Sequence, residues 1–172
     1  MVKESLELIG ELIKEIRTIS HLRHPPLLDE VGLSSALHLY LEGFAERSKI
    51  KAALEIPNDF GRHSSAVETT IFRVVQECLT NIHRHSGSAV AKVVISRVNH
   101  QLCVEVRDEG KGISPYKRSE MESGKAGVGV RGMRERIRQL GGTLEIGSPT
   151  NGRGTIIVAR LPVDRRAIKP AS

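Results

Sequence analysis

Two pairs of short, alternating, β-branched runs constrain the fold of this chain more than any other feature of its sequence. The first pair covers residues 90–98 and 102–107, and the second covers 143–148 and 155–161. Alternation with a period of two is typical of strands, and two such runs joined by a short turn predict an antiparallel hairpin. A doubly wound parallel sheet needs a helical crossover between successive strands, so these hairpins argue against it.

Helical spacing of apolar residues predicts the elements that surround the hairpins. The clearest helix runs from Ser64 to His85, with Ser64 or Ser65 as its cap and Glu68 in its first turn. The other predicted elements are helices over 32–49 and 130–140 and a strand over 50–56. Together they predict a two-layer α/β sandwich, in which one mixed, largely antiparallel sheet carries helices on one face.

A heptad-like apolar seam occupies residues 2–19, within a predicted helix that extends to about His24. So short a seam needs several facing helices to bury both of its apolar edges, which favours a bundle or a dimer. A helix packed on its own domain is the alternative. Because Pro25 and Pro26 cannot continue the helix, we expect a linker in HPPLLDEVGL, in which Asp29 or its neighbours can begin a new helix.

Composition excludes several classes of protein. With 172 residues, 39% hydrophobic and 27% charged, the chain has the balance of a globular domain. Its 26 Lys and Arg against 20 Asp and Glu give a net charge of +6, which suits nucleotide phosphates or an acidic partner as well as nucleic acid. Only 3% of the residues are aromatic, so stacking platforms for single-stranded nucleic acid are not expected.

Both cysteines, Cys78 and Cys103, stand in apolar contexts without metal-ligand spacing. We therefore expect buried, reduced thiols and a reducing compartment. No apolar run approaches the roughly 20 residues that cross a bilayer, and the first residues lack the pattern of a signal peptide. We expect the chain to be soluble.

The segment QECLTNIHRH brings four functional side chains to one face of the predicted helix. Glu77 and Asn81 are four residues apart, as are Asn81 and His85, and Arg84 lies beside them. An amide oxygen suits Mg²⁺ that is shared with substrate phosphates, and a basic group one turn on can meet those phosphates. A solvated polar face is the alternative for this segment taken alone.

The segment DEGKGI directly follows a predicted strand, although Asp and Gly are also common in turns. Asp108 can accept a hydrogen bond from an exocyclic amine, while Gly110 and Gly112 let the backbone approach a flat ring closely. Such a carboxylate favours adenine over guanine, because guanine has a carbonyl where adenine has the amine.

Glycines precede the last predicted helix in GKAGVGVRGMRERI, where Gly127 and Gly129 expose backbone amides that can bind phosphate. The segment follows a polar loop and lacks a Lys-Ser/Thr ending, so neither a Rossmann nor a Walker loop is indicated. Arg131 and Arg134 add positive charge, although solvation of the helix face explains each of them. In NGRGT, Thr155 can hydrogen-bond the same base, directly or through water.

The order of these segments, ExxxNxxRH, DxGxG, GxGxxGMRER and GxGT, resembles the ATP-binding domain of sensor histidine kinases. The wider superfamily includes gyrase, the ninety-kilodalton heat-shock chaperone and MutL. In more detail, HPPLLDEVGL, QECLTNIHRHS and GVGVRGMRERIRQLGGTLEI resemble the branch typified by the nitrate sensor and DegS, whose partners are LuxR-type response regulators. The resemblance extends from about Leu22 to Pro162 and implies the Bergerat-type ATP fold.

The resemblance implies a role for each site residue. Asn81 would hold Mg²⁺, Glu77 would be a catalytic polar or general-base group near it, Arg84 and His85 would face the phosphates, and Asp108 would bind the adenine amine. The remaining implied nucleotide-binding residues are Gly110, Gly112, Ile113, Gly127, Val128, Gly129 and Thr155. Residues 114–126 would form a mobile lid.

One feature departs from the family. There, the acceptor histidine lies on the first helix of a dimeric bundle and precedes an acidic residue, whereas none of the seven histidines here precedes Asp or Glu. His21 and His24 lie at the end of what resembles the second bundle helix. We therefore expect residues 1–26 to be the C-terminal helix of an incomplete dimerisation and phosphoacceptor bundle, 27–163 the ATP-binding domain and 164–172 a flexible tail.

The expected function is that of a histidine kinase catalytic domain, which transfers the γ-phosphoryl group of Mg·ATP to a histidine outside this chain and thence to a LuxR-type response regulator. Its other expected partner is its own phosphoacceptor domain, in a full-length homodimer. The expected location is cytoplasmic, alone or as part of a membrane-bound sensor. A degenerate ATP-binding regulatory module is the alternative. A nucleic-acid-binding module is disfavoured, because no recognition-helix signature or aromatic interleaving is present.

Overall fold

The computed structural model describes residues 26–122, 127–149 and 152–162. One sheet has the order β1-β2-β3-β5-β4, with strands β1 (Lys51–Glu55), β2 (Val90–Val98), β3 (Gln101–Asp108), β4 (Thr143–Gly147) and β5 (Ile156–Pro162). The helical elements are α2 (Pro26–Ser48), α3 (Ser65–Asn81), the π-helical turn η1 (Ile82–Ser86), α4 (Pro115–Glu122) and α5 (Val128–Gln139). Strands β1 and β2 pair in parallel, and the other three pairings are antiparallel.

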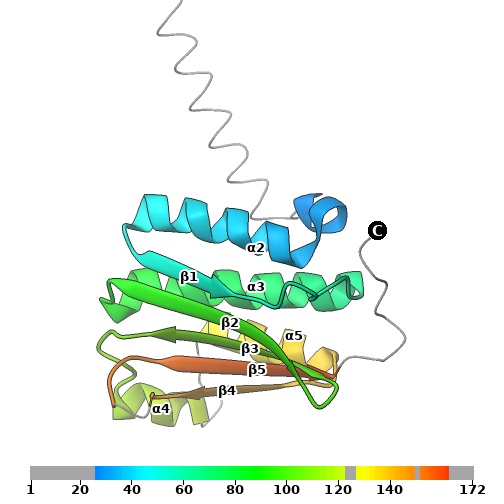
Figure 1. The fold of residues 1–172 in the computed structure, drawn as a ribbon. Coiled ribbons are helices and arrows are strands. Elements are labelled where there is room, and N and C mark those ends of the chain that lie inside the picture. Colours follow the sequence, from blue (N-terminus) through cyan, green and yellow to red (C-terminus); the bar gives the residue numbers. More distant parts are fainter. Residues whose placement is uncertain (1–25, 123–126, 150–151, 163–172) are drawn as a thin grey trace, which may run out of the picture.

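The sheet and the helices form two layers. In Figure 1, α3 and α5 lie behind the sheet, and α2 runs along its β1 side. Alternate side chains of β2 and β3 are buried, among them Val93 and Val104, while residues of the other sheet face form ion pairs such as Arg160–Glu145. The predicted two-layer sandwich with a mixed, largely antiparallel sheet is confirmed.

Local signals in the sequence account for several element boundaries. The Ser64 side chain accepts a hydrogen bond from the backbone N–H of Val67 (3.4 Å) and caps α3 as predicted. Asn99 and His100 join β2 to β3 with φ of 48° and 62°, and two positive φ values are characteristic of the type I′ turns that match the twist of a hairpin.

The new helix predicted to begin at Asp29 or its neighbours begins earlier, at Pro26, so Pro26 to Leu28 belong to α2 and not to a linker. Proline fits the first turn of a helix, where its missing N–H leaves no bond unmade. The helix is kinked at Gly32, whose φ of 78° and ψ of 171° are not helical. The apolar seam over 2–19 and the tail from 164 lie outside the described residues.

The two cysteines differ in burial. Cys78 is buried on α3, and burial raises the pKa of its thiol. Cys103 is only half-buried, because it lies on the sheet face that α3 and α5 leave uncovered. Both thiols are free. The prediction of a buried thiol is therefore confirmed for Cys78 and wrong for Cys103.

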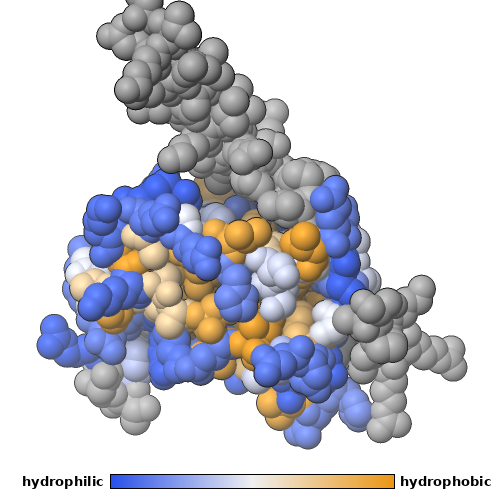
Figure 2. All heavy atoms as spheres, turned by 45° about the horizontal axis from the view of Figure 1, so that its top comes forward, coloured by the Kyte–Doolittle hydropathy of each residue, from blue (hydrophilic) through white to orange (hydrophobic). Residues whose placement is uncertain are grey.

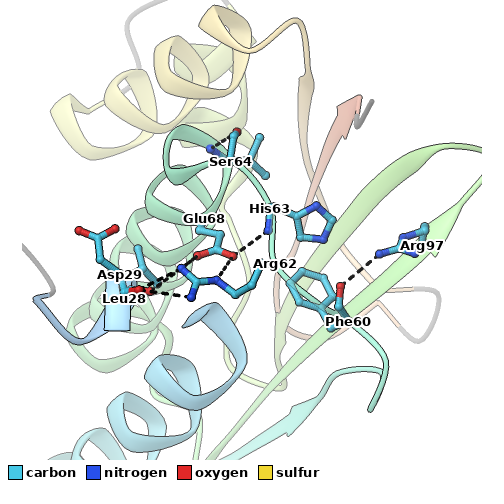
Figure 3. A network of polar contacts seen from close by, with 9 residues as sticks. Leu28, Asp29, Phe60, Arg62, His63, Ser64, Glu68 and Arg97 are labelled. Carbon is cyan, nitrogen blue, oxygen red and sulfur yellow. Dashed lines mark hydrogen bonds and ion pairs between the residues drawn. The ribbon is translucent and has the colours of Figure 1, made fainter. Parts of the chain in front are cut away.

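A buried carboxylate ties α2 to α3 (Figure 3). Glu68 is 1% exposed, and its oxygens accept hydrogen bonds from Arg62 Nε (3.1 Å), Arg62 Nη2 (3.3 Å) and the backbone N–H of His63 (2.8 Å). The same guanidinium donates to the carbonyl oxygens of Leu28 (3.3 Å) and Asp29 (3.2 Å), just before the kink in α2. Arg62 thus donates hydrogen bonds to the carbonyl oxygens of Leu28 and Asp29, which would lack regular helical N–H partners because the helix is interrupted at Gly32.

The ring of His63 packs on that of Phe60, with centroids 4.8 Å apart. Both ring nitrogens of His63 are buried and have no hydrogen-bond partner among the described residues. Burial, and next to it the charge of Arg97, lower the pKa of His63. Burial at this position therefore favours the uncharged form of the ring.

The surface on the α2 side carries apolar residues. Figure 2 brings this side forward and shows hydrophobic residues gathered near its middle, with hydrophilic residues around them. On α2 itself, Val31 and Leu39 are 43% and 53% exposed.

Among the helices that the structure describes, none is both long and apolar enough to cross a membrane.

The contacts of Glu68 predict the effect of removing its partner. Substitution of Arg62→Ala should lower the free energy of unfolding by about 2–4 kcal/mol, because it leaves a buried charge without its main donors. The matched control is Arg160→Ala, which removes an exposed ion pair with Glu145 and should cost less than about 1 kcal/mol. Urea denaturation of both variants measures the difference. Equal losses would show that Arg62 contributes no more than a surface ion pair.

Candidate functional site

A cavity of about 570 Å³ opens between α3, η1, the start of α5 and the ends of β3 and β5. Of the twelve residues predicted from sequence, the structure places eleven in its wall: Glu77, Asn81, Arg84, His85, Asp108, Gly112, Ile113, Gly127, Val128, Gly129 and Thr155. These residues come from four segments that are separate in the sequence. The volume lies within the usual range for small-molecule sites, about 300–1,000 Å³.

Glu77 and Asn81 form one side of the cavity. Asn81 Nδ2 donates a hydrogen bond to Glu77 Oε1 (3.3 Å), which leaves Asn81 Oδ1 as an acceptor. Helix α5 approaches this pair closely: a Cβ atom at Gly129 would lie 1.8 Å from Glu77 Oε1. A side chain at position 129 would therefore displace the Glu77 carboxylate.

The helix predicted to continue to His85 changes its geometry after Asn81. The π-helical turn η1 carries Arg84 and His85, and both side chains are exposed while lining the cavity. A π turn adds one residue to the hydrogen-bonded ring, and such turns occur frequently at functional sites. The four predicted side chains reach one cavity, although they do not lie on one regular α-helix.

Asp108 lies on the opposite side of the cavity, at the end of β3, and is 4% exposed. Its backbone N–H donates to the carbonyl oxygen of Thr155 (3.0 Å), and its Oδ1 accepts from the backbone N–H of Gly110 (2.8 Å). Asp108 Oδ2 is then the carboxylate oxygen that remains for a ligand. A buried carboxylate with one oxygen already engaged has a fixed orientation toward a donor in the cavity.

Gly110 is the one predicted residue that does not line the cavity. It lies instead against η1, where a Cβ atom at position 110 would be 2.2 Å from the carbonyl oxygen of Ser86. The role of Gly110 beside a bound ring stays a prediction. The structure shows one reason for glycine here, which is close contact between two backbone segments.

Helix α4 occupies part of the 114–126 segment that was expected to be a lid. Lys117, Glu120 and Met121 of α4 line the cavity, and Arg134 Nη1 of α5 donates to the carbonyl oxygen of Met121 (2.8 Å). Arg134 therefore links α5 to α4, a role that solvation of a helix face did not predict. Residues 123–126 of the expected lid lie outside the described residues.

The backbone amides at the start of α5 supply donors at the cavity wall. Gly127 caps the helix, and Gly127, Val128, Gly129 and Val130 all line the cavity. Val128 is 84% exposed. The first N–H groups of a helix have no partner within the helix and attract anionic groups.

Sequence reasoning missed several lining residues. Lys111, within DEGKGI, could have been found from its motif, and Ser86 from its place just after His85. The apolar wall includes Cys78, Ile82, Val106, Val130, Ile146 and Ile157, which alternation assigns to the core without distinguishing the part that faces a ligand. Lys117, Glu120 and Met121 lie in the segment that the resemblance predicts as a lid, but no local pattern singles them out within it.

A magnesium ion shared with a nucleotide fits the residues present. Within the described ranges, no three His, Cys, Asp or Glu side chains gather as a metal site, so a cage made by the protein alone is absent there. Mg²⁺ commonly keeps waters and takes one or two protein ligands together with phosphate oxygens. The acceptor oxygen of Asn81 is suited to that arrangement.

The fold and the cavity define the class of protein: an α/β sandwich with a cavity between its helices and the ends of two strands, lined by polar side chains and by an apolar wall. Residues 66–165 match the family model of histidine kinase-, DNA gyrase B- and HSP90-like ATPases. The chain belongs to this family, and membership implies that it binds ATP.

Three relatives are similar along most of this chain. The sensor histidine kinase MctS of Rhizobium johnstonii is 32% identical over 94% of the chain, the oxygen sensor histidine kinase NreB of Staphylococcus carnosus 31% over 91%, and the sensor histidine kinase LiaS of Bacillus subtilis 34% over 90%. The matches cover 34%, 44% and 41% of these relatives. The chain thus spans less than half of each.

Solved structures support the fold. The histidine kinase domain of the blue-light activated histidine kinase from Erythrobacter litoralis has a TM-score of 0.61 at 24% identity, covering 76% of this chain and 61% of that one. The catalytic domain of histidine kinase ThkA has a TM-score of 0.59 at 17% identity, covering 79% and 93%. At these identities, the similarity establishes the fold alone.

Proposed function

We propose that this chain is the Mg·ATP-binding catalytic portion of a sensor histidine kinase, which transfers the γ-phosphoryl group to a histidine outside this chain and thence to a response regulator. The observation that carries the proposal is the convergence of four sequence-distant motifs on one cavity. The family match and the three relatives named as sensor histidine kinases support it.

In this proposal, Asp108 selects the base. Its Oδ2 accepts a hydrogen bond from the exocyclic amine of adenine, while Thr155 contacts the same base. Guanine would present a carbonyl oxygen to the buried carboxylate, so two acceptors would face each other without a proton between them. Gly112 and Ile113 form the wall beneath the base.

The phosphates extend from the base toward η1 and α5. Arg84 and His85 face them from η1, and the backbone amides from Gly127 to Gly129 face them from the helix N-terminus. Asn81 Oδ1 ligates Mg²⁺, and the ion, when bound, neutralises charge on the phosphate oxygens. Glu77 orients Asn81 through their hydrogen bond and is the polar or general-base group nearest the metal.

Transfer requires an acceptor imidazole at the γ-phosphorus. A nitrogen–phosphorus bond forms as the bond from phosphorus to the bridging oxygen breaks, and ADP leaves. The residues of this chain contribute position and charge, which supply most of the catalysis in phosphoryl transfer. No observation on the cavity favours a degenerate module, since Glu77, Asn81 and Asp108 are all present.

The same proposal assigns the domains of this chain, its partners and its location. Residues 1–26 belong to a dimerisation and phosphoacceptor bundle, 27–163 form the ATP-binding domain and 164–172 a tail. The partners are that bundle in a homodimer and a LuxR-type response regulator, without direct contact to nucleic acid, and the location is cytoplasmic.

Base selection can be tested with Asp108→Asn. The amide places a donor or a neutral acceptor where adenine needs the carboxylate, so ATP affinity should fall by about 10- to 100-fold. Calorimetry with Mg·ATP and Mg·GTP measures the effect, and wild-type protein should bind ATP much more tightly than GTP. Equal binding of the two nucleotides, or an unchanged Asp108→Asn variant, would rule out this assignment.

Phosphoryl transfer can be tested with γ-labelled ATP. This chain alone should gain no alkali-stable label, because none of its seven histidines precedes an acidic residue. The same chain joined behind a complete phosphoacceptor bundle of a histidine kinase should become labelled, and Asp108→Asn should prevent the labelling. Stable label on the chain alone would contradict an external acceptor. An unlabelled fusion that still binds ATP would instead favour a regulatory module.

A further inference from the structure

Ser86 joins the two sides of the cavity, although none of the predicted roles includes it. We propose that Ser86 is a positioning residue of the nucleotide site: it fixes the distance between the phosphate-facing turn η1 and the loop that directly follows Asp108. This inference rests on the proposed function, because it concerns how the same site holds ATP.

The side chain of Ser86 ends the π-helical turn. It is 7% exposed, and its Oγ donates to the carbonyl oxygen of Ile82 (2.8 Å) while it accepts from the backbone N–H of Ser88 (2.9 Å). Gly87 follows with a φ of 68° and turns the chain away from the helix. The hydroxyl thus defines where the turn stops, immediately after Arg84 and His85.

The backbone of Ser86 attaches this turn to the loop after β3. Its carbonyl oxygen accepts from the backbone N–H of Lys111 (2.9 Å) and lies where a Cβ atom at Gly110 would be, at 2.2 Å. A second link is close by, since Ser88 Oγ accepts from the backbone N–H of Glu109 (3.1 Å). Three consecutive residues of the loop therefore contact this region: Gly110 and Lys111 contact Ser86 at the end of η1, and Glu109 contacts Ser88 just after it.

ATP would contact both segments that meet at this joint, by which we mean the contacts of Ser86 with Gly110 and Lys111. When one ligand makes two sets of contacts, the second set contributes fully only if its position relative to the first is fixed. Adenosine touches the Asp108 side alone and does not depend on that distance. Loosening the joint should therefore weaken ATP binding much more than adenosine binding.

The chain contains a matched control at the end of α2. Ser48 Oγ donates to the carbonyl oxygen of Phe44 (2.7 Å) and accepts from the backbone N–H of Ile50 (3.2 Å), and Lys49 follows with a φ of 61°. The pattern of hydrogen bonds is the same as at Ser86. Ser48 does not line the cavity. The same two hydrogen bonds therefore end a helical element at both serines, and at Ser86 they also hold a turn that would face the nucleotide.

The test compares Ser86→Ala, Ser86→Thr and Ser48→Ala with the wild-type chain. Dissociation constants for Mg·ATP and for adenosine are measured by calorimetry, and folding is checked by thermal unfolding. In Ser86→Ala, ATP affinity should fall about tenfold while adenosine affinity changes less than about twofold, because one hydroxyl with two hydrogen bonds is lost away from the base. Ser86→Thr, which keeps the hydroxyl, and Ser48→Ala should both keep the wild-type ratio of the two constants.

Each outcome decides one claim. If wild-type protein binds neither ligand, the proposed function fails. If wild-type protein binds ATP more tightly than adenosine and Ser86→Ala keeps that ratio, the function stands and the positioning role of Ser86 is overturned. An equal change of the ratio in Ser48→Ala would show that the loss of ATP affinity reflects general stability. A change of the ratio in Ser86→Thr would show that it reflects the shape of the side chain. Either result would overturn the role of the hydroxyl.

Discussion

The hydrogen bond from the backbone N–H of Lys111 to the carbonyl oxygen of Ser86 (2.9 Å) connects two of the segments that form the cavity. One segment ends α3 and presents Asn81 and the basic residues of η1, and the other begins at the end of β3 and presents Asp108. In the proposed function both segments are needed, because each would contact only one end of the nucleotide. The close packing of Gly110 on Ser86 makes this connection short and excludes a side chain from it.

The sequence was sufficient to predict the sheet and many of the residues that line the cavity. Alternating runs located the two hairpins, and the cap at Ser64 located the start of α3, because both signals depend on neighbouring residues. The site residues were found because polar side chains stood in ordered motifs. Their convergence on one cavity could be expected only from the resemblance to a known family, since spacing along the chain does not fix distances between segments.

Three expectations differ from the structure, each at a particular element. The spacing of Asn81 and His85 indicates a regular helix, whereas the structure has a π turn at Ile82–Ser86, whose last residue is hydrogen-bonded to a loop more than twenty residues later. Pro26 is expected in a linker, yet it begins α2, in which the carbonyls of Leu28 and Asp29 accept hydrogen bonds from Arg62. Helix α4 lacks a clear apolar face, so the sequence predicts a loop there. At η1 and α2, contacts with residues distant in the sequence accompany the departure from the local pattern.

The central claim is that both segments contact one nucleotide, and a crystal structure of this chain with Mg²⁺ and a non-hydrolysable ATP analogue tests it most directly. We expect the adenine amine within hydrogen-bonding distance of Asp108 Oδ2, the metal at Asn81 Oδ1, and the phosphates between η1 and the N-terminus of α5. A base that points out of the cavity, or phosphates that do not contact η1 or α5, would contradict the account.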